Sequence, residues 1–220
     1  MNTLTPQIFE ILIADDKLSP TTRMLCFAAT AASINNMNAV ESAVVFSLSN
    51  TLATHTELYE SLLQTYLFAG FPAALESLSV LYNCLENKPN KQTIPTYNLN
   101  EYRLRGENLC RRIYTNVYEK MRMKLGKISP ELDQWMIIEG YGKTLSRPGI
   151  PTKTRELISA SSLAALGWEN QLYSHIRGAV NVGATHSECR ALLPGLRILC
   201  DAGRYSRTET IIDSVLEGLQ

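Results

Sequence analysis

A short helix-start motif occurs twice in the sequence, and this repeat constrains the fold more than any other feature. Residues 53–57 read Ala-Thr-His-Thr-Glu, and residues 184–188 read Ala-Thr-His-Ser-Glu. In both, a threonine precedes a glutamate by three residues, which predicts a capping box at the start of a helix. Upstream, the pattern Thr-Arg-x-Leu at 22–25 returns at 154–157. Because the matches keep their order at nearly constant spacing, we predict two diverged copies of one helical repeat.

The sequence predicts an all-α fold. Strand signals are scarce, and apolar residues recur at helical spacing. Ser-Pro pairs at 19–20 and 129–130 are typical of an N-cap followed by proline at the first helical position. Gly70 and Gly167 are expected to end helices, because glycine readily adopts the left-handed conformation found there.

A polar stretch separates the two copies. Residues 87–99 are rich in Lys, Pro and Asn and poor in apolar side chains, which is typical of a linker. We therefore expect a first, degenerate repeat at 1–87, a linker at 88–99 and a second repeat at 100–220. Residues 100–128 are expected to form one long helix with a locally basic surface, either solvated, facing a subunit or binding an anion.

Composition excludes several classes of protein. The 21 basic and 21 acidic residues balance, and no basic run marks a nucleic-acid-binding surface. No apolar stretch approaches a membrane span, and the N-terminus lacks the pattern of a signal peptide. The five cysteines form no C-x-x-C pair and show no metal-ligand spacing. We expect a cytoplasmic protein with no membrane or nucleic-acid partner and no bound metal.

One pair of residues is a candidate for chemistry. Glu156 lies early in a helix predicted to end near Gly167, and His175 lies in the next helix, so an antiparallel hairpin would bring the two nearly level. A carboxylate facing an imidazole is suited to general acid–base catalysis. The corresponding first-copy positions are Met24 and about Val44. The alternative is a buried pair that only fastens two helices.

The second copy also carries a long family-like pattern. Residues 145–157 read LSRPGIPTKTREL, residues 164–167 read AALG, and residues 175–185 read HIRGAVNVGAT, followed by Glu188. This pattern closely resembles the carboxymuconolactone decarboxylase family of the alkylhydroperoxidase-D-like superfamily. The first copy resembles it more weakly, through Thr22-Arg23 and the segment YLFAGFPAA at 66–74.

The resemblance implies two tandem alkylhydroperoxidase-D-like helical repeats that assemble into trimers or hexamers. It also implies a site that combines a Glu on one helix with a His on the next. In the peroxidase branch of the superfamily, a C-x-x-C pair lies between them. The corresponding residues here are Trp168 and Gln171. Thiol peroxidase activity is therefore the least favoured alternative, because it needs an attacking and a resolving thiol.

The decarboxylase branch of the family implies a lyase that uses no cofactor. Its substrate is a small lactone carrying carboxylates. By resemblance, His175 would donate or shuttle the proton and Glu156 would orient it, while Trp168 and Gln171 would line the pocket; Trp168 is equally interpretable as core. Arg147 or Arg155 would neutralise a substrate carboxylate. For both arginines, a structural ion pair or helix contact is the alternative.

Each copy is incomplete against the family pattern. The second copy has Gly-Arg-Tyr-Ser at 203–206 where the first has Gly-Phe-Pro-Ala-Ala at 70–74, and the first copy lacks the Glu and the His. A subunit contact would complete the site, or the site has drifted to another substrate. We expect an acid–base enzyme acting on a small carboxylated lactone or related carbonyl acid, with or without decarboxylation. The alternative is a non-catalytic oligomeric scaffold or small-molecule binder of the same fold.

Overall fold

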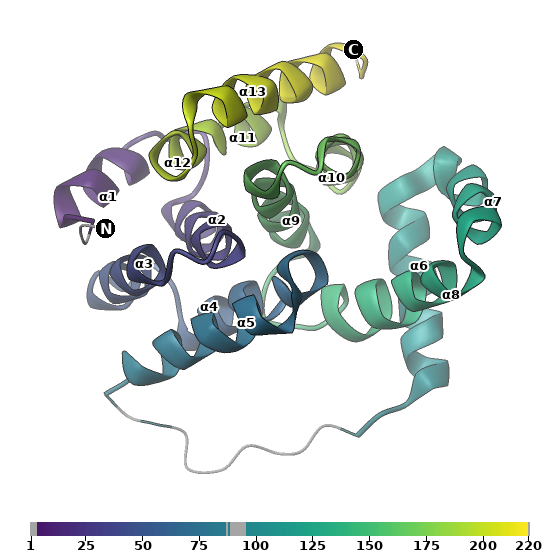
Figure 1. Ribbon diagram of the computed structural model, residues 1–220, viewed down its shortest axis with the longest axis horizontal. Helices are drawn as coiled ribbons and strands as arrows, with labels where there is room; N and C mark the ends of the chain where they lie inside the picture. Colours follow the sequence, from purple (N-terminus) through teal and green to yellow (C-terminus); the bar gives the residue numbers. More distant parts are fainter. Residues whose placement is uncertain (1–3, 87, 89–95, 220) are drawn as a thin grey trace. The chain divides into compact units, whose positions relative to one another are not determined.

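The computed structural model describes residues 4–86, 88 and 96–219, and within them the chain forms helices and turns without a strand (Figure 1). The predicted all-α fold is confirmed for this part of the chain. Most of the linker expected at 88–99 lies outside the described residues. The chain divides into two compact units, one formed by residues 1–86 and 149–220 and the other by residues 87–148.

Ten helices make up the described part of the first unit: α1 (Pro6–Ile13), α2 (Pro20–Ser33), α3 (Met37–Ser49), α4 (His55–Leu63), α5 (Tyr66–Asn83), α9 (Thr152–Leu166), α10 (Glu169–Asn181), α11 (His186–Arg190), α12 (Leu193–Leu199) and α13 (Ala202–Glu217). Their starts follow the predicted caps. The Ser19 side chain accepts a hydrogen bond from the Thr22 N–H at the start of α2. Capping boxes form at both copies of the repeated motif, at the starts of α4 and α11.

Glycines end or interrupt helices where the sequence predicts it. Gly167 follows α9 in the left-handed conformation, with φ of 81°. Gly70 breaks α5 with φ of 84° and ψ of 170°, so two helical segments meet there at a kink. Both are conformations that side-chain-bearing residues adopt with strain.

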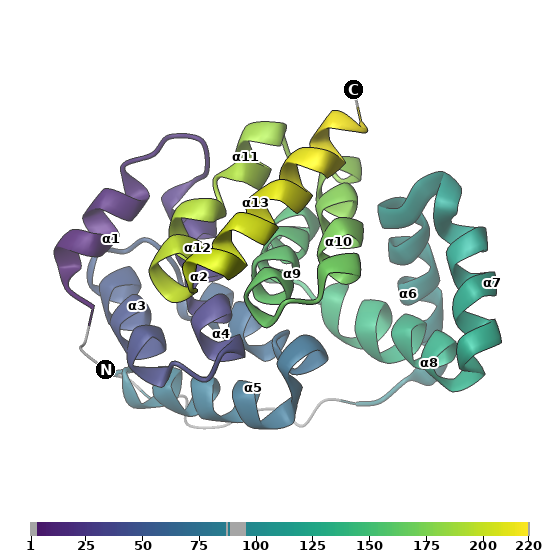
Figure 2. The ribbon, with the colours of Figure 1, turned by 45° about the horizontal axis from the view of Figure 1, so that its top comes forward.

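The interior of the first unit is built around α2 and α9, which lie side by side and are surrounded by the other helices of that unit (Figures 1 and 2). These helices carry the repeated Thr-Arg-x-Leu pattern. Residues 23–33 of α2 and 154–164 of α9 are all buried. Side chains of both helices therefore form the core shared by the two predicted copies.

Two buried arginines reach from one predicted copy to the other at corresponding positions, although their acceptors there differ. Arg23 Nη1 donates to the backbone carbonyl of Ala191 at 2.7 Å, and Arg155 Nη2 donates to Glu60 Oε2 at 2.8 Å. Arg23 corresponds to Arg155, and position 60 corresponds to position 191 in the spacing of the cap motif. This reciprocity is what a duplicated repeat folded around a pseudo-two-fold axis would produce, although the duplication remains a prediction.

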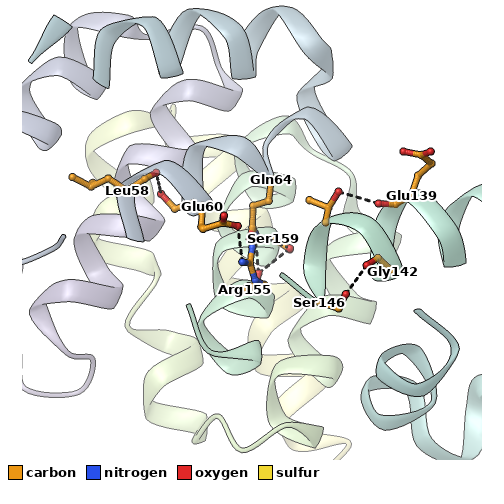
Figure 3. A network of polar contacts seen from close by, with 10 residues as sticks. Leu58, Glu60, Gln64, Glu139, Gly142, Ser146, Arg155 and Ser159 are labelled. Atoms are coloured by element: carbon orange, nitrogen blue, oxygen red, sulfur yellow. Dashed lines mark hydrogen bonds and ion pairs between the residues drawn. The ribbon is translucent and has the colours of Figure 1, made fainter. Parts of the chain in front are cut away.

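The second unit comprises α6 (Leu99–Tyr114), the 3₁₀ turn η1 (Thr115–Val117), α7 (Tyr118–Ile128), α8 (Pro130–Trp135) and the π-helix η2 (Met136–Leu145). The prediction of one helix over 100–128 is wrong, because the chain bends at Thr115, whose φ is 48°. Backbones of α6 and η2 touch at Gly142, where a Cβ would lie 1.9 Å from the Tyr102 carbonyl oxygen. The carbonyl of Gly142 also accepts a hydrogen bond from Ser146 (Figure 3).

No helix in the described part of the chain is both long enough and apolar enough to cross a membrane.

Candidate functional site

The candidate pair lies in a helical hairpin of the first unit. Helix α9 ends at Gly167, α10 begins at Glu169, and the two helices pack against each other. His175 Nδ1 lies 2.9 Å from Glu156 Oε2, which is hydrogen-bond distance. The expectation that these residues come level in an antiparallel hairpin is therefore confirmed.

The pair is buried, yet its hydrogen bonding is incomplete. Glu156 is 0% exposed and His175 is 7% exposed. An ionised Glu156 can only accept hydrogen bonds, and in that state the hydrogen of this bond resides on Nδ1 of His175. Among the described residues, neither Nε2 of His175 nor Oε1 of Glu156 has a hydrogen-bond partner. Because buried polar atoms are normally paired, the unpaired Oε1 of Glu156 indicates a place for water or a ligand beside the imidazole.

Gln171 lies one turn before His175 on the same face of α10, because the two are four residues apart in the helix. Trp168 precedes the helix as its N-cap residue, with φ of -84° and ψ of 75°. Trp168 is 57% exposed and Gln171 is also exposed, whereas His175 is buried. Both side chains are therefore open to solvent near the start of α10, and Trp168 is not part of the core. Their role in lining a pocket remains a prediction.

Phe68 of α5 also contacts the site, although the sequence reasoning did not assign it there. Its ring centroid lies 5.6 Å from that of His175, and the two ring planes stand at 87° in an edge-to-face arrangement. Phe68 belongs to the first-copy segment that resembles the family, residues 66–74. The family resemblance had drawn attention to this segment, but the sequence did not predict that Phe68 contacts His175.

The two arginine candidates occupy different places. Arg155 is 1% exposed, and its guanidinium donates to Glu60 Oε2 at 2.8 Å and to Gln64 Oε1 at 3.1 Å (Figure 3). This placement favours the structural alternative for Arg155. Arg147 is partly buried in the turn after η2 and belongs to the unit formed by residues 87–148.

The cysteines are poorly suited to thiol chemistry. Burial raises the pKa of the Cys26 thiol to about 12, and burial likewise raises the pKa of the Cys189 thiol to about 12. Burial also raises the pKa values of Cys84 and Cys200 above the ordinary value. A thiol with so high a pKa supplies almost no thiolate near neutral pH. The described residues also contain no cluster of three His, Cys, Asp or Glu side chains arranged to hold a metal ion.

Comparison with known proteins agrees with the resemblance. Residues 130–206 match the sequence model of the carboxymuconolactone decarboxylase family. A curated protein of Acinetobacter baylyi, named 4-carboxymuconolactone decarboxylase, is 42% identical over 53 residues. That alignment covers 24% of this chain and 40% of the relative, so the chain spans less than half the length of the relative it matches. Glu156, Trp168, Gln171 and His175 all lie within the residues that the family model matches.

Proposed function

From the premise that residues 130–206 carry the pattern of the carboxymuconolactone decarboxylase family, we propose that the chain is a lyase-type acid–base enzyme. It acts without a cofactor on a small carboxylated lactone or a related carbonyl acid. Glu156 and His175 form the reacting pair. The relative's name, 4-carboxymuconolactone decarboxylase, supports this class of substrate.

The incomplete hydrogen bonding of the buried pair is the observation that carries the proposal. Glu156 holds Nδ1 of His175 at 2.9 Å, which fixes the tautomer and leaves Nε2 as the nitrogen that exchanges a proton. In the neutral ring Nε2 accepts a proton, and in the imidazolium it donates one. A pair that only fastened two helices would have no need of a buried carboxylate oxygen, Glu156 Oε1, that lacks a partner.

The chemistry requires one well-placed proton. In decarboxylation, the bond between the carboxylate carbon and its neighbour breaks, carbon dioxide leaves, and the electron pair passes into the unsaturated lactone. Nε2–H of His175 then delivers a proton to carbon, and the ring takes a proton from solvent to complete the cycle. Without decarboxylation, the same nitrogen removes a proton from one carbon and returns it to another.

On the substrate side, Trp168 and Gln171 are proposed to line the approach to His175, because they lie at the start of its helix and are exposed. Arg155 is not proposed to bind the substrate carboxylate, because its guanidinium already donates hydrogen bonds to Glu60 and Gln64 inside the protein.

The test is turnover of a panel of carboxylated lactones by the wild type, His175→Gln and Glu156→Gln, following carbon dioxide release and deuterium uptake from D₂O. His186→Gln is the matched control, since His186 belongs to the helix-start motif and not to the pair. We expect His175→Gln to lose at least about 100-fold in kcat, in line with the usual contribution of a general acid or base. The control is expected to keep wild-type activity.

One observation favours the non-catalytic alternative: Glu156 is entirely buried and His175 nearly so. In that case no lactone would turn over, and both substitutions would lower the melting temperature while leaving no chemical phenotype. Turnover that persists unchanged in a folded His175→Gln variant would also overturn the proposed role of the pair.

A further inference from the structure

We propose that the two copies share one active site: Phe68, from the copy that lacks the acid–base pair, is a positioning residue for the imidazole of His175. This inference rests on the proposed function, since it concerns how the proton-transferring nitrogen is aimed. It gives the degenerate first copy a role in the site of the second. It also removes the need for a neighbouring subunit to supply this part of the site.

The corner between α4 and α5 is fixed against the turn of α9 that carries Glu156. Gln64 is fully buried, and its Nε2 donates to the backbone carbonyl of Arg155 at 3.1 Å and to Ser159 Oγ at 3.3 Å (Figure 3). The guanidinium of Arg155 donates back to Gln64 Oε1. These contacts lie on either side of Glu156 in the sequence, so the first copy is anchored at the base of the pair.

Phe68 lies one helical turn beyond this anchor and is held there by the backbone. Its N–H donates to the Thr65 carbonyl at 3.0 Å, and the N–H of Ala69 donates to the same carbonyl at 2.8 Å. The helix then breaks at Gly70. Phe68 thus belongs to a short turn between a buried anchor and a fixed bend, and its ring meets His175 at 5.6 Å with the planes at 87°.

The two contacts restrain different motions of the imidazole. The bond from Nδ1 to Glu156 sets which nitrogen carries the hydrogen and opposes large rotations of the ring, but a single hydrogen bond tolerates smaller tilts. An edge-to-face neighbour resists these tilts and favours one ring orientation by about two- to tenfold. Together they determine where Nε2 points. In the predicted first copy, the position equivalent to His175 falls at or near Val44, so that copy has no imidazole to restrain.

The test compares Phe68→Leu, Phe68→Tyr and Phe71→Leu in the full chain. Leucine keeps an apolar side chain but removes the ring, whereas tyrosine restores it. Phe71 is the matched control, because it lies in the same segment, is 75% exposed and stacks on Tyr66 rather than on His175. Two readouts are used: kcat and KM on the lactone turned over by the wild type, and the ¹⁵N chemical shifts of the His175 ring nitrogens. His175→Gln identifies those resonances among the three histidines.

We expect Phe68→Leu to lower kcat about three- to tenfold with KM changed less than twofold. In the same variant the His175 ring nitrogen shifts should differ from those of the wild type, because the ring of Phe68 no longer holds one imidazole orientation. Phe68→Tyr and Phe71→Leu should match the wild type in both readouts. Unchanged kcat and unchanged His175 nitrogen shifts in a folded Phe68→Leu would overturn the inference. Where the wild type turns over no lactone, the nitrogen shifts alone decide, so this inference and the proposed function fail separately.

Discussion

The buried network around Arg155 predicts a large and specific loss of stability. The side chains of Arg155 and Glu60 are 1% and 5% exposed, and their charged atoms lie 2.8 Å apart. Arg155→Met keeps most of the apolar volume but removes the guanidinium from a carboxylate buried in the protein. Removing one partner of a buried ion pair costs about 3–5 kcal/mol, because the remaining charge has lost its compensation. We expect a loss of this size in the free energy of unfolding.

The expected loss corresponds to a fall in melting temperature of about 6–20 °C for a chain of this length. The assay is equilibrium denaturation of the wild type and variants at one protein concentration, followed by circular dichroism, with melting curves as a second measure. The double variant Glu60→Leu/Arg155→Met should recover much of the loss, since a buried pair replaced as a whole by apolar side chains is often tolerated. That recovery would identify the stranded carboxylate as the source of the cost.

A matched control distinguishes this pair from an ordinary surface contact. Arg190 and Asp213 form an ion pair at 2.8 Å with side chains 46% and 43% exposed, so Arg190→Met should cost less than about 1 kcal/mol. If Arg155→Met were as mild as Arg190→Met but abolished binding of carboxylated lactones, the structural interpretation of Arg155 would be refuted. Arg155 would then have to be returned to the substrate-binding residues.

Three further predictions follow from single contacts. Thr185→Ala removes the side-chain half of a capping box and should cost about 1 kcal/mol in denaturant titrations; no measurable loss would argue against the cap. Gly167→Ala should cost about 1–2 kcal/mol, because φ is 81° and the added Cβ would lie 1.8 Å from Arg204 Nη1; the loss should persist in an Arg204→Ala background, where only the backbone strain remains. Cys26 and Cys189, with pKa values raised by burial to about 12, should resist a thiol-specific reagent at pH 8 and react on unfolding, and rapid labelling of the native protein would contradict this.

Local signals account for the part of the fold that the sequence predicted well. The capping boxes, the Ser19 cap and the stop at Gly167 depend on residues within four positions of one another, so their chemistry is visible in the sequence. The long helix expected over 100–128 failed for the opposite reason. Thr115 adopts φ of 48°, but no Gly or Pro nearby indicates a break there. The helical pattern continues across this residue, so the sequence did not predict the bend.

In the candidate site, too, the local arrangement was predictable from the sequence and the long-range contacts were not. Glu156 and His175 were predictable as a pair, because two helices joined by a short turn at Gly167 bring them level whatever the rest of the chain does. Which way their side chains point was not predictable from spacing. The remaining surroundings depend on contacts between residues about ninety or more positions apart, such as Gln64 with Ser159 and Phe68 with His175. No sequence period encodes those contacts.

Arg155 was a candidate for substrate binding, but in the structure it is paired inside the protein. A family pattern can therefore indicate which residues lie near a site without indicating what each one does. A buried guanidinium next to the reacting glutamate looks equally suited to a substrate carboxylate and to a carboxylate of the protein. Only the position of Glu60 decides between them, and Arg23 likewise donates across the core, to the Ala191 carbonyl, without any acid–base pair beside it. Because Arg23 makes such a contact with no Glu–His pair nearby, the arginines are better explained by holding the core together than by binding the substrate. The same packing brings Phe68 to the histidine that it is proposed to position.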